Sequence, residues 1–267
     1  MRHFYILTCL SLLIACSGPK QVSSVPSSGN LVVNGKLWSS VFQQKAAEYK
    51  ALCIQAYNIA QLRLDEALKQ PASKPRAIIT DIDETFLDNS PFAVHQALQG
   101  KDYEPAAWTE WTNKGAADTV PGALSFFSYA AANNVEVFYI TNRRESDRPG
   151  TLQNLQLFKF PFADEQHLVL RKDVSSKEPR RQQVAATHDI ILLLGDNLAD
   201  FSPLFDTRKS TDERAATVQQ LAAEFGKRFI VLPNTNYGGW EDALYGNKTG
   251  LTAIQKDSAV KSNLKGF

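Results

Sequence analysis

The sequence predicts an α/β fold in which a parallel sheet is covered by helices on both faces. Two observations lead to this prediction. Short apolar segments typical of strands alternate along the chain with segments that have helical periodicity. Polar side chains also follow directly after three of the strand-like segments, and ligands bind at the carboxyl ends of the strands in sheets of this kind. We therefore expect one functional site at that edge of the sheet.

The chain begins with a segment typical of export. Residues 1–16 read MRHFYILTCLSLLIAC, with a charged start, an apolar stretch too short to span a bilayer, and small residues near its end. We predict a signal peptide over residues 1–15. Residues 16–38 are rich in Ser, Gly, Pro and Val, so we predict a flexible tether there.

The bulk composition describes an ordinary globular protein. Of its 267 residues, 43% are hydrophobic and 21% are charged. The 29 Lys and Arg residues nearly balance the 28 Asp and Glu residues, which argues against a general affinity for nucleic acid polymers. Two of the three cysteines lie in residues 1–16, so a framework of disulfides is not expected.

The first folded elements are a helix and a strand. Between residues 39 and 70, apolar residues recur at three- and four-residue steps, which predicts a helix with one buried stripe. Residues 77–79 are apolar and partly β-branched, which is typical of a buried strand. The strand ends in two carboxylates one residue apart, Asp81 and Asp83.

The rest of the chain continues the alternation. Pro121-Gly122 opens a helix that runs through about residue 133. The further strands are expected at residues 135–140, 167–170, 190–194 and 229–232. The helices between them are expected up to about residue 158, at residues 177–187 and at residues 212–225.

Asp81 and Asp83 suit either of two roles. If they continue the strand, they share one face, and burying two carboxylates that close requires a cation or a shared proton. The alternative is a helix cap or a turn after the strand. Thr141-Asn142-Arg143 and Asp196 follow two other strands, so their arrival at the same edge favours a site over a turn.

Four motifs in order carry a resemblance to a known family. They are DIDET at Asp81–Thr85, ITNR at Ile140–Arg143, Lys177 at a helix start, and GDNLADF at Gly195–Phe201. This order and spacing resembles the haloacid dehalogenase (HAD) superfamily. The strings IITDIDETFLDN and ILLLGDNLADF resemble its class C acid phosphatases, bacterial lipoproteins with four essential aspartates. The resemblance covers roughly residues 40–245, and its two small departures are Thr80 and Phe92.

The resemblance implies a domain plan. Residues 39–267 would form one phosphatase domain with a Rossmann-like core, from about residues 74–90 and 118–235. A small, mostly helical cap would come from residues 39–73, residues 91–117 and the C-terminal segment.

The N-terminal segment carries a separate resemblance. Leu13-Ile14-Ala15-Cys16 resembles a lipobox, which implies that Cys16 carries diacylglycerol and tethers the enzyme to a membrane. By the same resemblance to bacterial lipoproteins, Ser17 after the cysteine, in place of Asp, implies the outer membrane where the cell has one, or otherwise the cell surface. A plain secretory signal is the alternative.

The resemblance also assigns the chemistry. Asp81 would be the nucleophile that forms an aspartyl-phosphate. Because no Cys or His cluster is present, an oxygen-ligated Mg²⁺ fits best, and the implied ligands are the side chains of Asp81 and Asp196 and the carbonyl of Asp83. Asp200 would support the site by holding a metal-bound water or Lys177.

The other predicted roles concern the phosphoryl group and the leaving group. The Asp83 side chain, free of the metal, would act as general acid and base. Thr141 and Lys177 would bind the phosphoryl oxygens, with assistance from Asn142 and Arg143. Trp108 and Tyr237 are candidates to hold an aromatic leaving group, for which stacking is worth ~1–3 kcal/mol per base. The alternative is that both are simply buried cap residues. Glu84 and Thr85 are interpreted as structural.

Together these features predict a Mg²⁺-dependent acid phosphomonoesterase that acts on small phosphate monoesters such as 5′-nucleotides. One alternative is a degenerate, ligand-binding surface lipoprotein. Another is a phosphotransferase of the same superfamily. The sequence leaves open whether the protein is a homodimer.

Overall fold

The computed structural model describes residues 31–267, and its centre is a parallel sheet with strand order β5-β4-β1-β6-β7. All neighbouring strands of this sheet pair in parallel. The strands are β1 (Arg76–Thr80), β4 (Glu136–Ile140), β5 (Leu168–Val169), β6 (Asp189–Gly195) and β7 (Phe229–Val231). The predicted α/β fold is therefore confirmed, and each of the five expected strands is present.

Both faces of the sheet are buried, because successive side chains of β1 enter two different cores. Ile78 packs in a large cluster with Phe86 and Tyr139. Ala77 and Ile79 pack on the opposite face. Helices α2 (Ala47–Leu68), α5 (Ala123–Ala132) and α6 (Arg148–Leu157) contribute to the first core, and α7 (Glu178–Thr187) contributes to the second. This double burial explains why the strands are apolar throughout.

The predicted helix over residues 39–70 is two helices. α1 (Leu31–Lys45) and α2 are separated at Ala46, whose backbone is extended. The first eight residues of α1 also shorten the predicted tether, because residues 31–38 are helical. α2 carries the expected buried stripe, but it packs against β6, β7 and α5. The structure thus places α2 with the sheet core rather than with the cap predicted over residues 39–73.

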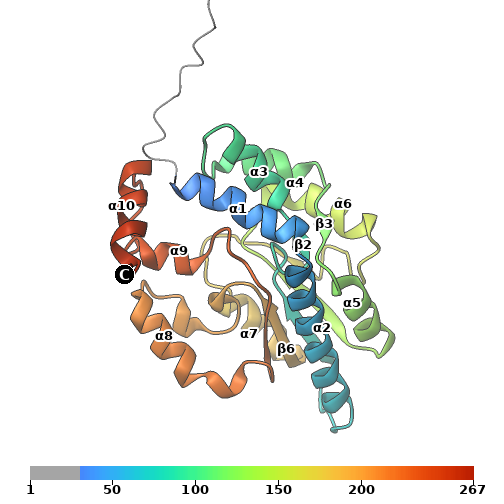
Figure 1. Ribbon diagram of the computed structural model, residues 1–267. Helices are drawn as coiled ribbons and strands as arrows, with labels where there is room; N and C mark the ends of the chain where they lie inside the picture. The colour runs from blue at the N-terminus through green and yellow to red at the C-terminus, as the bar shows by residue number, and fades with distance from the viewer. Residues whose placement is uncertain (1–30) are drawn as a thin grey trace, which may run out of the picture.

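The cap comes from segments far apart in the sequence. α3 (Ser90–Leu98) and α4 (Pro105–Asn113) lie near α1, and α9 (Gly239–Leu244) and α10 (Ala253–Asn263) follow the last strand (Figure 1). α1 contacts both α3 and α10. The short antiparallel strands β2 (Leu87–Asp88) and β3 (Asp118–Thr119) pair where the chain leaves the core for α3 and α4 and returns.

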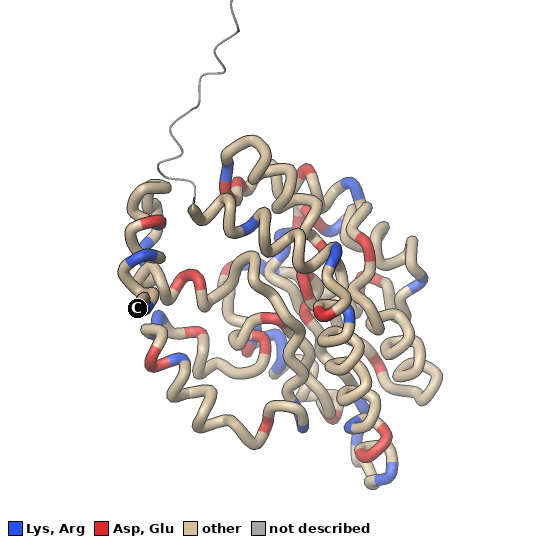
Figure 2. Tube along the Cα trace, in the orientation of Figure 1, with Lys and Arg blue, Asp and Glu red and all other residues tan. Residues whose placement is uncertain are grey.

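The remaining predictions differ only in detail. The helix expected at residues 212–225 is α8 (Thr211–Gln220), followed by a 3₁₀ turn at Ala222–Glu224. Figure 2 shows Lys and Arg interspersed with Asp and Glu along the chain, as a near-neutral total predicts. Within residues 31–267, no helix is both long enough and apolar enough to cross a bilayer. The predicted signal peptide, Cys16 and residues 16–30 of the tether lie outside the described residues.

Candidate active site

Three predicted site residues lie together because the ends of three strands are level. The register pairs Thr80 at the end of β1 with Tyr139 of β4 and with Leu194 of β6. Asp81, Thr141 and Asp196 therefore follow neighbouring strands at the same edge. The backbone N–H of Asp81 donates to the Leu194 carbonyl (3.0 Å), which fixes the start of the loop after β1 against β6.

Lys177 joins two of the predicted aspartates. It lies directly before α7, and its Nζ is 2.5 Å from Oδ1 of Asp81 and 2.7 Å from Oδ1 of Asp200. The lysine side chain is only 5% exposed. Burial by itself lowers the pKa of Lys177. The carboxylates of Asp200 and Asp81 together outweigh burial, so the net shift of this pKa is upward. The ammonium group is therefore a fixed positive charge within the site.

Asp81, Asp196 and Asp200 form a compact carboxylate cluster. Each offers one oxygen within 4.8 Å of the others. Burial raises the pKa of Asp81 to about 7, with Lys177 opposing the rise and Asp200 adding to it. Burial, Asp200 and Asp81 hold the pKa of Asp196 well above its usual range.

The chemistry of this cluster fits a hard divalent cation. Among the described residues, it consists of carboxylates alone, which suits a cation that prefers oxygen ligands. Oδ1 of Asp81 is fully buried and accepts no well-aligned hydrogen bond from the described residues, although the Lys177 ammonium lies beside it. The mutual repulsion of three carboxylates, of which Asp200 is buried and the other two are partly buried, would be relieved by a bound cation.

Asp196 and Asp200 are held differently. Asp196 accepts hydrogen bonds from Thr85 Oγ1 (3.2 Å) and from Asn234 Nδ2 (2.7 Å). Asp200 is occupied on both sides, by Lys177 at Oδ1 and by the backbone N–H of Asn197 at Oδ2 (2.9 Å). Of the two contacts predicted for Asp200, a metal-bound water or Lys177, the structure shows the one with Lys177. It also gives Thr85 a contact with the cluster.

A glycine makes room for Asp200. A Cβ added at Gly195 would lie 2.4 Å from Oδ2 of Asp200 and 2.5 Å from its Cβ. The glycine of the GDN motif therefore allows the Asp200 carboxylate to fold back against the end of β6.

Asp83 is paired rather than free. Its Oδ1 accepts hydrogen bonds from Nη2 (2.7 Å) and Nε (3.0 Å) of Arg143, and from Nδ2 of Asn89 (2.9 Å). Arg143 is 3% exposed and also donates to Thr151 Oγ1 (2.9 Å). The guanidinium of Arg143 contacts both carboxylate oxygens of Asp83, since its Nε also donates to Oδ2 (3.3 Å). Arg143 therefore orients Asp83, a more defined role than the assistance predicted for it.

Thr141 and Asn142 are linked to an arginine that the motifs do not include. Thr141 is fully buried, and its Oγ1 accepts a hydrogen bond from the backbone N–H of Arg143 (3.1 Å). Asn142 accepts from Nη2 of Arg180 (2.7 Å), while Nη1 of Arg180 donates to the Thr141 carbonyl (2.6 Å). Arg180 lies on α7, one turn after Lys177, so the same helix positions both cations.

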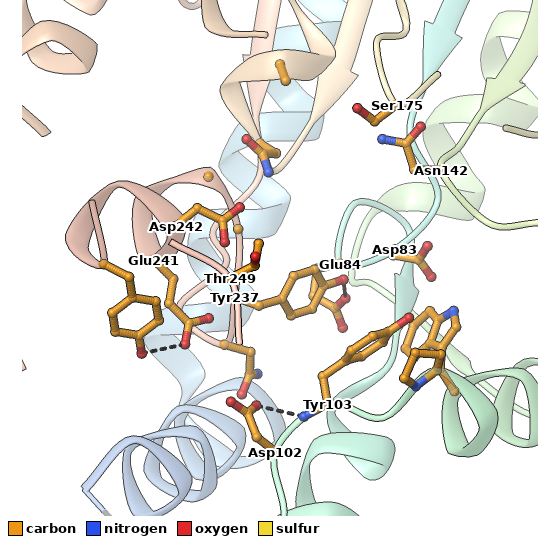
Figure 3. Close-up of a pocket in the computed structure, with 18 of the residues that line it drawn as sticks. Asp83, Glu84, Asp102, Tyr103, Asn142, Ser175, Tyr237, Glu241, Asp242 and Thr249 are labelled. Carbon is orange, nitrogen blue, oxygen red and sulfur yellow. Dashed lines mark hydrogen bonds between the residues drawn. The ribbon is translucent and has the colours of Figure 1, made fainter. Parts of the chain in front are cut away.

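A cavity of about 1020 Å³ opens beside Asp83, Asn142 and Arg143. Asp83, Asn142, Tyr103 and Tyr237 are among the residues that line it (Figure 3). Trp108 lines it as well. Tyr103, 55% exposed, and Tyr237 both extend toward the interior of the cavity (Figure 3). The cavity is large enough for a leaving group with an aromatic ring.

The two predicted aromatic residues behave differently. Tyr237 presents its ring to the cavity, and its hydroxyl donates a hydrogen bond to Glu84 (Figure 3). Trp108 packs edge-on against Phe92, with ring centroids 5.1 Å apart, and lies under the Arg143 guanidinium at 5.8 Å. The sequence prediction missed Tyr103, because a tyrosine between charged residues in a loop belongs to no motif or periodic pattern that would indicate a role in binding.

Comparisons with known proteins agree with this geometry. A family model described as HAD superfamily, subfamily IIIB (acid phosphatase), matches residues 21–240. The class C acid phosphatase of Bacillus anthracis with tungstate bound is similar, with a TM-score of 0.85 and 40% identity over 89% of this chain and 99% of that chain. A second structure of the Bacillus anthracis enzyme has a TM-score of 0.85 and 39% identity over 88% of this chain and 99% of that chain.

A plant enzyme is similar over a shorter stretch. Acid phosphatase 1 of Solanum lycopersicum is 28% identical over 93 residues, which is 35% of this chain. The chain therefore spans about a third of the length of that relative, 36%.

Proposed function

The chain belongs to subfamily IIIB of the HAD superfamily, the acid phosphatases, and we propose that it is a Mg²⁺-dependent phosphomonoesterase with Asp81 as nucleophile. The observation that carries the proposal is the meeting of Asp81, Asp196 and Lys177 at one edge of the sheet. A carboxylate attacks a phosphate ester only where negative charge is neutralised nearby. This cluster holds one ammonium group and suits one divalent cation.

The ligands that we propose for Mg²⁺ are the side chains of Asp81 and Asp196 and the carbonyl of Asp83. The cation would supply charge neutralisation for the phosphoryl oxygens and for the carboxylates around it. Asp200 holds Lys177 through a 2.7 Å ion pair, so it keeps the ammonium group beside Asp81. Thr85 and Asn234 hold the Asp196 carboxylate from the other side.

The residues of the chain would divide the reaction into two displacements. In the first, an oxygen of Asp81 attacks phosphorus, the ester bond breaks, and Asp83 gives a proton to the leaving alkoxide. In the second, Asp83 takes a proton from a water molecule, whose oxygen attacks phosphorus and releases Asp81 and phosphate. Lys177 and the Thr141 hydroxyl would hold the phosphoryl oxygens in both steps.

We propose nucleotides as substrates on the basis of the cavity. Asp83 lies on the cavity wall, so a leaving group in the cavity would place its ester oxygen near this residue. Tyr103 and Tyr237 offer rings on which a base can stack, for ~1–3 kcal/mol. The similar Bacillus anthracis enzyme binds tungstate, a tetrahedral oxyanion like phosphate, which supports a phosphoryl site on this fold.

We also propose that the mature protein is anchored by lipid on Cys16, on the strength of the sequence Leu13-Ile14-Ala15-Cys16. In the native host, the Cys16→Ser variant should leave the membrane fraction, and wild type should stay there after a high-salt wash. Wild type in the soluble fraction would contradict the anchor without affecting the catalytic proposal.

Phosphate release tests the catalytic proposal. We expect wild type to release phosphate from adenosine 5′-monophosphate at acidic pH with Mg²⁺, and to lose this activity in EDTA. Asp81→Asn, which keeps the shape of the side chain, should be inactive under both conditions. Turnover that persists in EDTA would contradict the metal, and turnover in Asp81→Asn would contradict the nucleophile. If an added alcohol receives the phosphoryl group in preference to water, the enzyme is a phosphotransferase.

A further inference from the structure

Asn89 is a buried residue that hydrogen-bonds to the loop carrying Asp83 and Glu84 and to the cap. It is 2% exposed and directly precedes α3. Its Nδ2 donates to Oδ1 of Asp83 (2.9 Å), and its backbone N–H donates to Oε1 of Glu84 (2.8 Å). Its Oδ1 accepts from the indole N–H of Trp111 on α4 (2.8 Å). Asn89 thus contacts the proposed general acid and the cap through its side chain, and a second buried acid through its backbone.

The partners determine how this amide is oriented. An indole N–H can only donate a hydrogen bond, so the oxygen of the Asn89 amide must face Trp111. Oδ1 of Asp83 also accepts hydrogen bonds from Arg143, so the nitrogen of the Asn89 amide must face this oxygen. Trp111 therefore anchors the amide in the one orientation that presents a donor to Asp83. This role needs both ends of the asparagine side chain.

Glu84 extends the network to the cavity wall. Glu84 is 1% exposed, and its carboxylate accepts a hydrogen bond from the backbone N–H of Asn89. It accepts another from the hydroxyl of Tyr237 (Figure 3). Its backbone has φ 54°, a conformation that is uncommon for residues other than glycine. The tight turn directs the Glu84 side chain away from that of Asp83 and toward Tyr237 (Figure 3). A continuous path of hydrogen bonds thus runs from Tyr237 through Glu84 and Asn89 to Asp83.

We propose that Asn89 is a positioning residue that couples the aromatic wall of the cavity to the general acid, Asp83. The inference rests on the proposed function. A base that packs against the ring of Tyr237 restricts the motion of that residue and, through Glu84 and Asn89, of the Asp83 carboxylate. The binding energy of the base is then used to align the acid with the leaving oxygen, which raises kcat and not only affinity.

Two substrates with the same leaving oxygen isolate this effect. Adenosine 5′-monophosphate and ribose 5-phosphate both release a ribose 5′-alkoxide, and only the first carries a base. In wild type we expect kcat for the nucleotide to exceed kcat for the sugar phosphate. Tyr237→Phe keeps the ring but removes the hydroxyl, so the ratio of the two kcat values should fall toward one while stacking keeps KM low for the nucleotide.

Asn89→Ala should have two effects. The ratio of the kcat values should again fall toward one, and kcat for ribose 5-phosphate should fall about tenfold, because the acid is no longer aligned. In the double variant with Tyr237→Phe, the ratio should fall no further, since both changes break the same path. Full additivity of the two changes would overturn the coupling, and so would a wild-type ratio of one.

A matched control separates positioning from folding. Asn154 is also 2% exposed, and its amide makes two hydrogen bonds to the backbone of Ala117, away from the cavity. Asn154→Ala should lower the melting temperature about as much as Asn89→Ala without changing the kcat ratio. If Asn154→Ala shifts the ratio equally, Asn89 has only a structural role.

A second variant guards against misfolding. Asn89→Asp keeps the acceptor for Trp111 but replaces the donor to Asp83 with a carboxylate. If Asn89→Ala does not fold, Asn89→Asp should still lower kcat for ribose 5-phosphate and bring the kcat ratio toward one, and an unchanged ratio in this folded variant would overturn the proposal. A wild type that hydrolyses neither substrate would instead overturn the proposed function itself.

Discussion

Removing the charge of Lys177 is a severe test of the site's electrostatics. The ammonium group is 5% exposed and lies between the carboxylates of Asp81 and Asp200, which are 12% and 5% exposed. Breaking a buried ion pair by deleting one partner typically costs about 3–5 kcal/mol, because the remaining charge stays buried. We therefore expect Lys177→Met, which keeps the length of the side chain, to lose about 3–5 kcal/mol in the free energy of unfolding.

A second substitution tests the cause of this loss. Asp200→Asn removes one of the two carboxylates that Lys177→Met leaves without a cation. The double variant should therefore be more stable than Lys177→Met alone, by about 1 kcal/mol or more. Mg²⁺ at about 100 times its Kd should stabilise wild type or Lys177→Met by about 2.7 kcal/mol, provided that it binds only the folded state.

Urea unfolding in EDTA and in Mg²⁺ measures all of these differences. The exposed pair of Lys114 with Glu110 supplies a control, and Lys114→Met should change stability by no more than about 0.5 kcal/mol. A loss below about 1 kcal/mol in Lys177→Met, with no recovery in the double variant, would refute the reasoning, because a buried charge cluster should not tolerate such a change.

Three further predictions concern the cap and the cavity. Burial raises the pKa of Asp102, but Lys36, Lys256 and the backbone N–H of Tyr103 together lower it more, to about 2. About 2 kcal/mol of stability should therefore be present above pH 4 and disappear as the pH falls through 2, and stability in Asp102→Asn should not fall over this range. At Gly150 a Cβ would lie 2.2 Å from a backbone carbonyl oxygen of α4, so Gly150→Ala should cost about 1–3 kcal/mol in thermal unfolding, whereas Gly35→Ala, with open space around it, should not destabilise. Tyr103→Ala should lower kcat/KM for adenosine 5′-monophosphate about tenfold and leave ribose 5-phosphate unaffected, and equal losses on both would exclude stacking.

The central site could be predicted because its residues sit at strand ends. Asp81, Thr141 and Asp196 follow apolar runs, and parallel strands bring such positions to one edge whatever the loops do. Lys177 was found because the family places a lysine at a helix start after these motifs. Asp81 and Asp200 lie close enough to pair with this lysine because the packed core brings the start of α7 next to the ends of the strands.

The remaining site residues had no local signal. Asn234 lies in the loop after β7, and Arg180 lies on the helix that also carries Lys177, so their contacts depend on tertiary packing. Tyr103 belongs to a loop whose conformation is set by the ion pairs around Asp102. The pairing of Asp83 with Arg143 could not be read from two motifs 60 residues apart.

The predicted boundaries failed where packing overrides pattern. The break at Ala46 interrupts an apolar stripe that continues through it, because the chain turns from the cap to the sheet at that residue. Residues 31–38 look like a linker in composition, yet they form the first turns of α1, which packs against α3 and α10.

The most direct test of the account is to find the phosphorylated residue. Wild type mixed with adenosine 5′-monophosphate should be quenched within one turnover and reduced with borohydride, which converts an aspartyl-phosphate to homoserine. Peptide mass spectrometry should then locate homoserine at Asp81, with none in protein that received no substrate. Homoserine at another aspartate, or single-turnover phosphate release with no modified aspartate, would contradict Asp81 as the nucleophile.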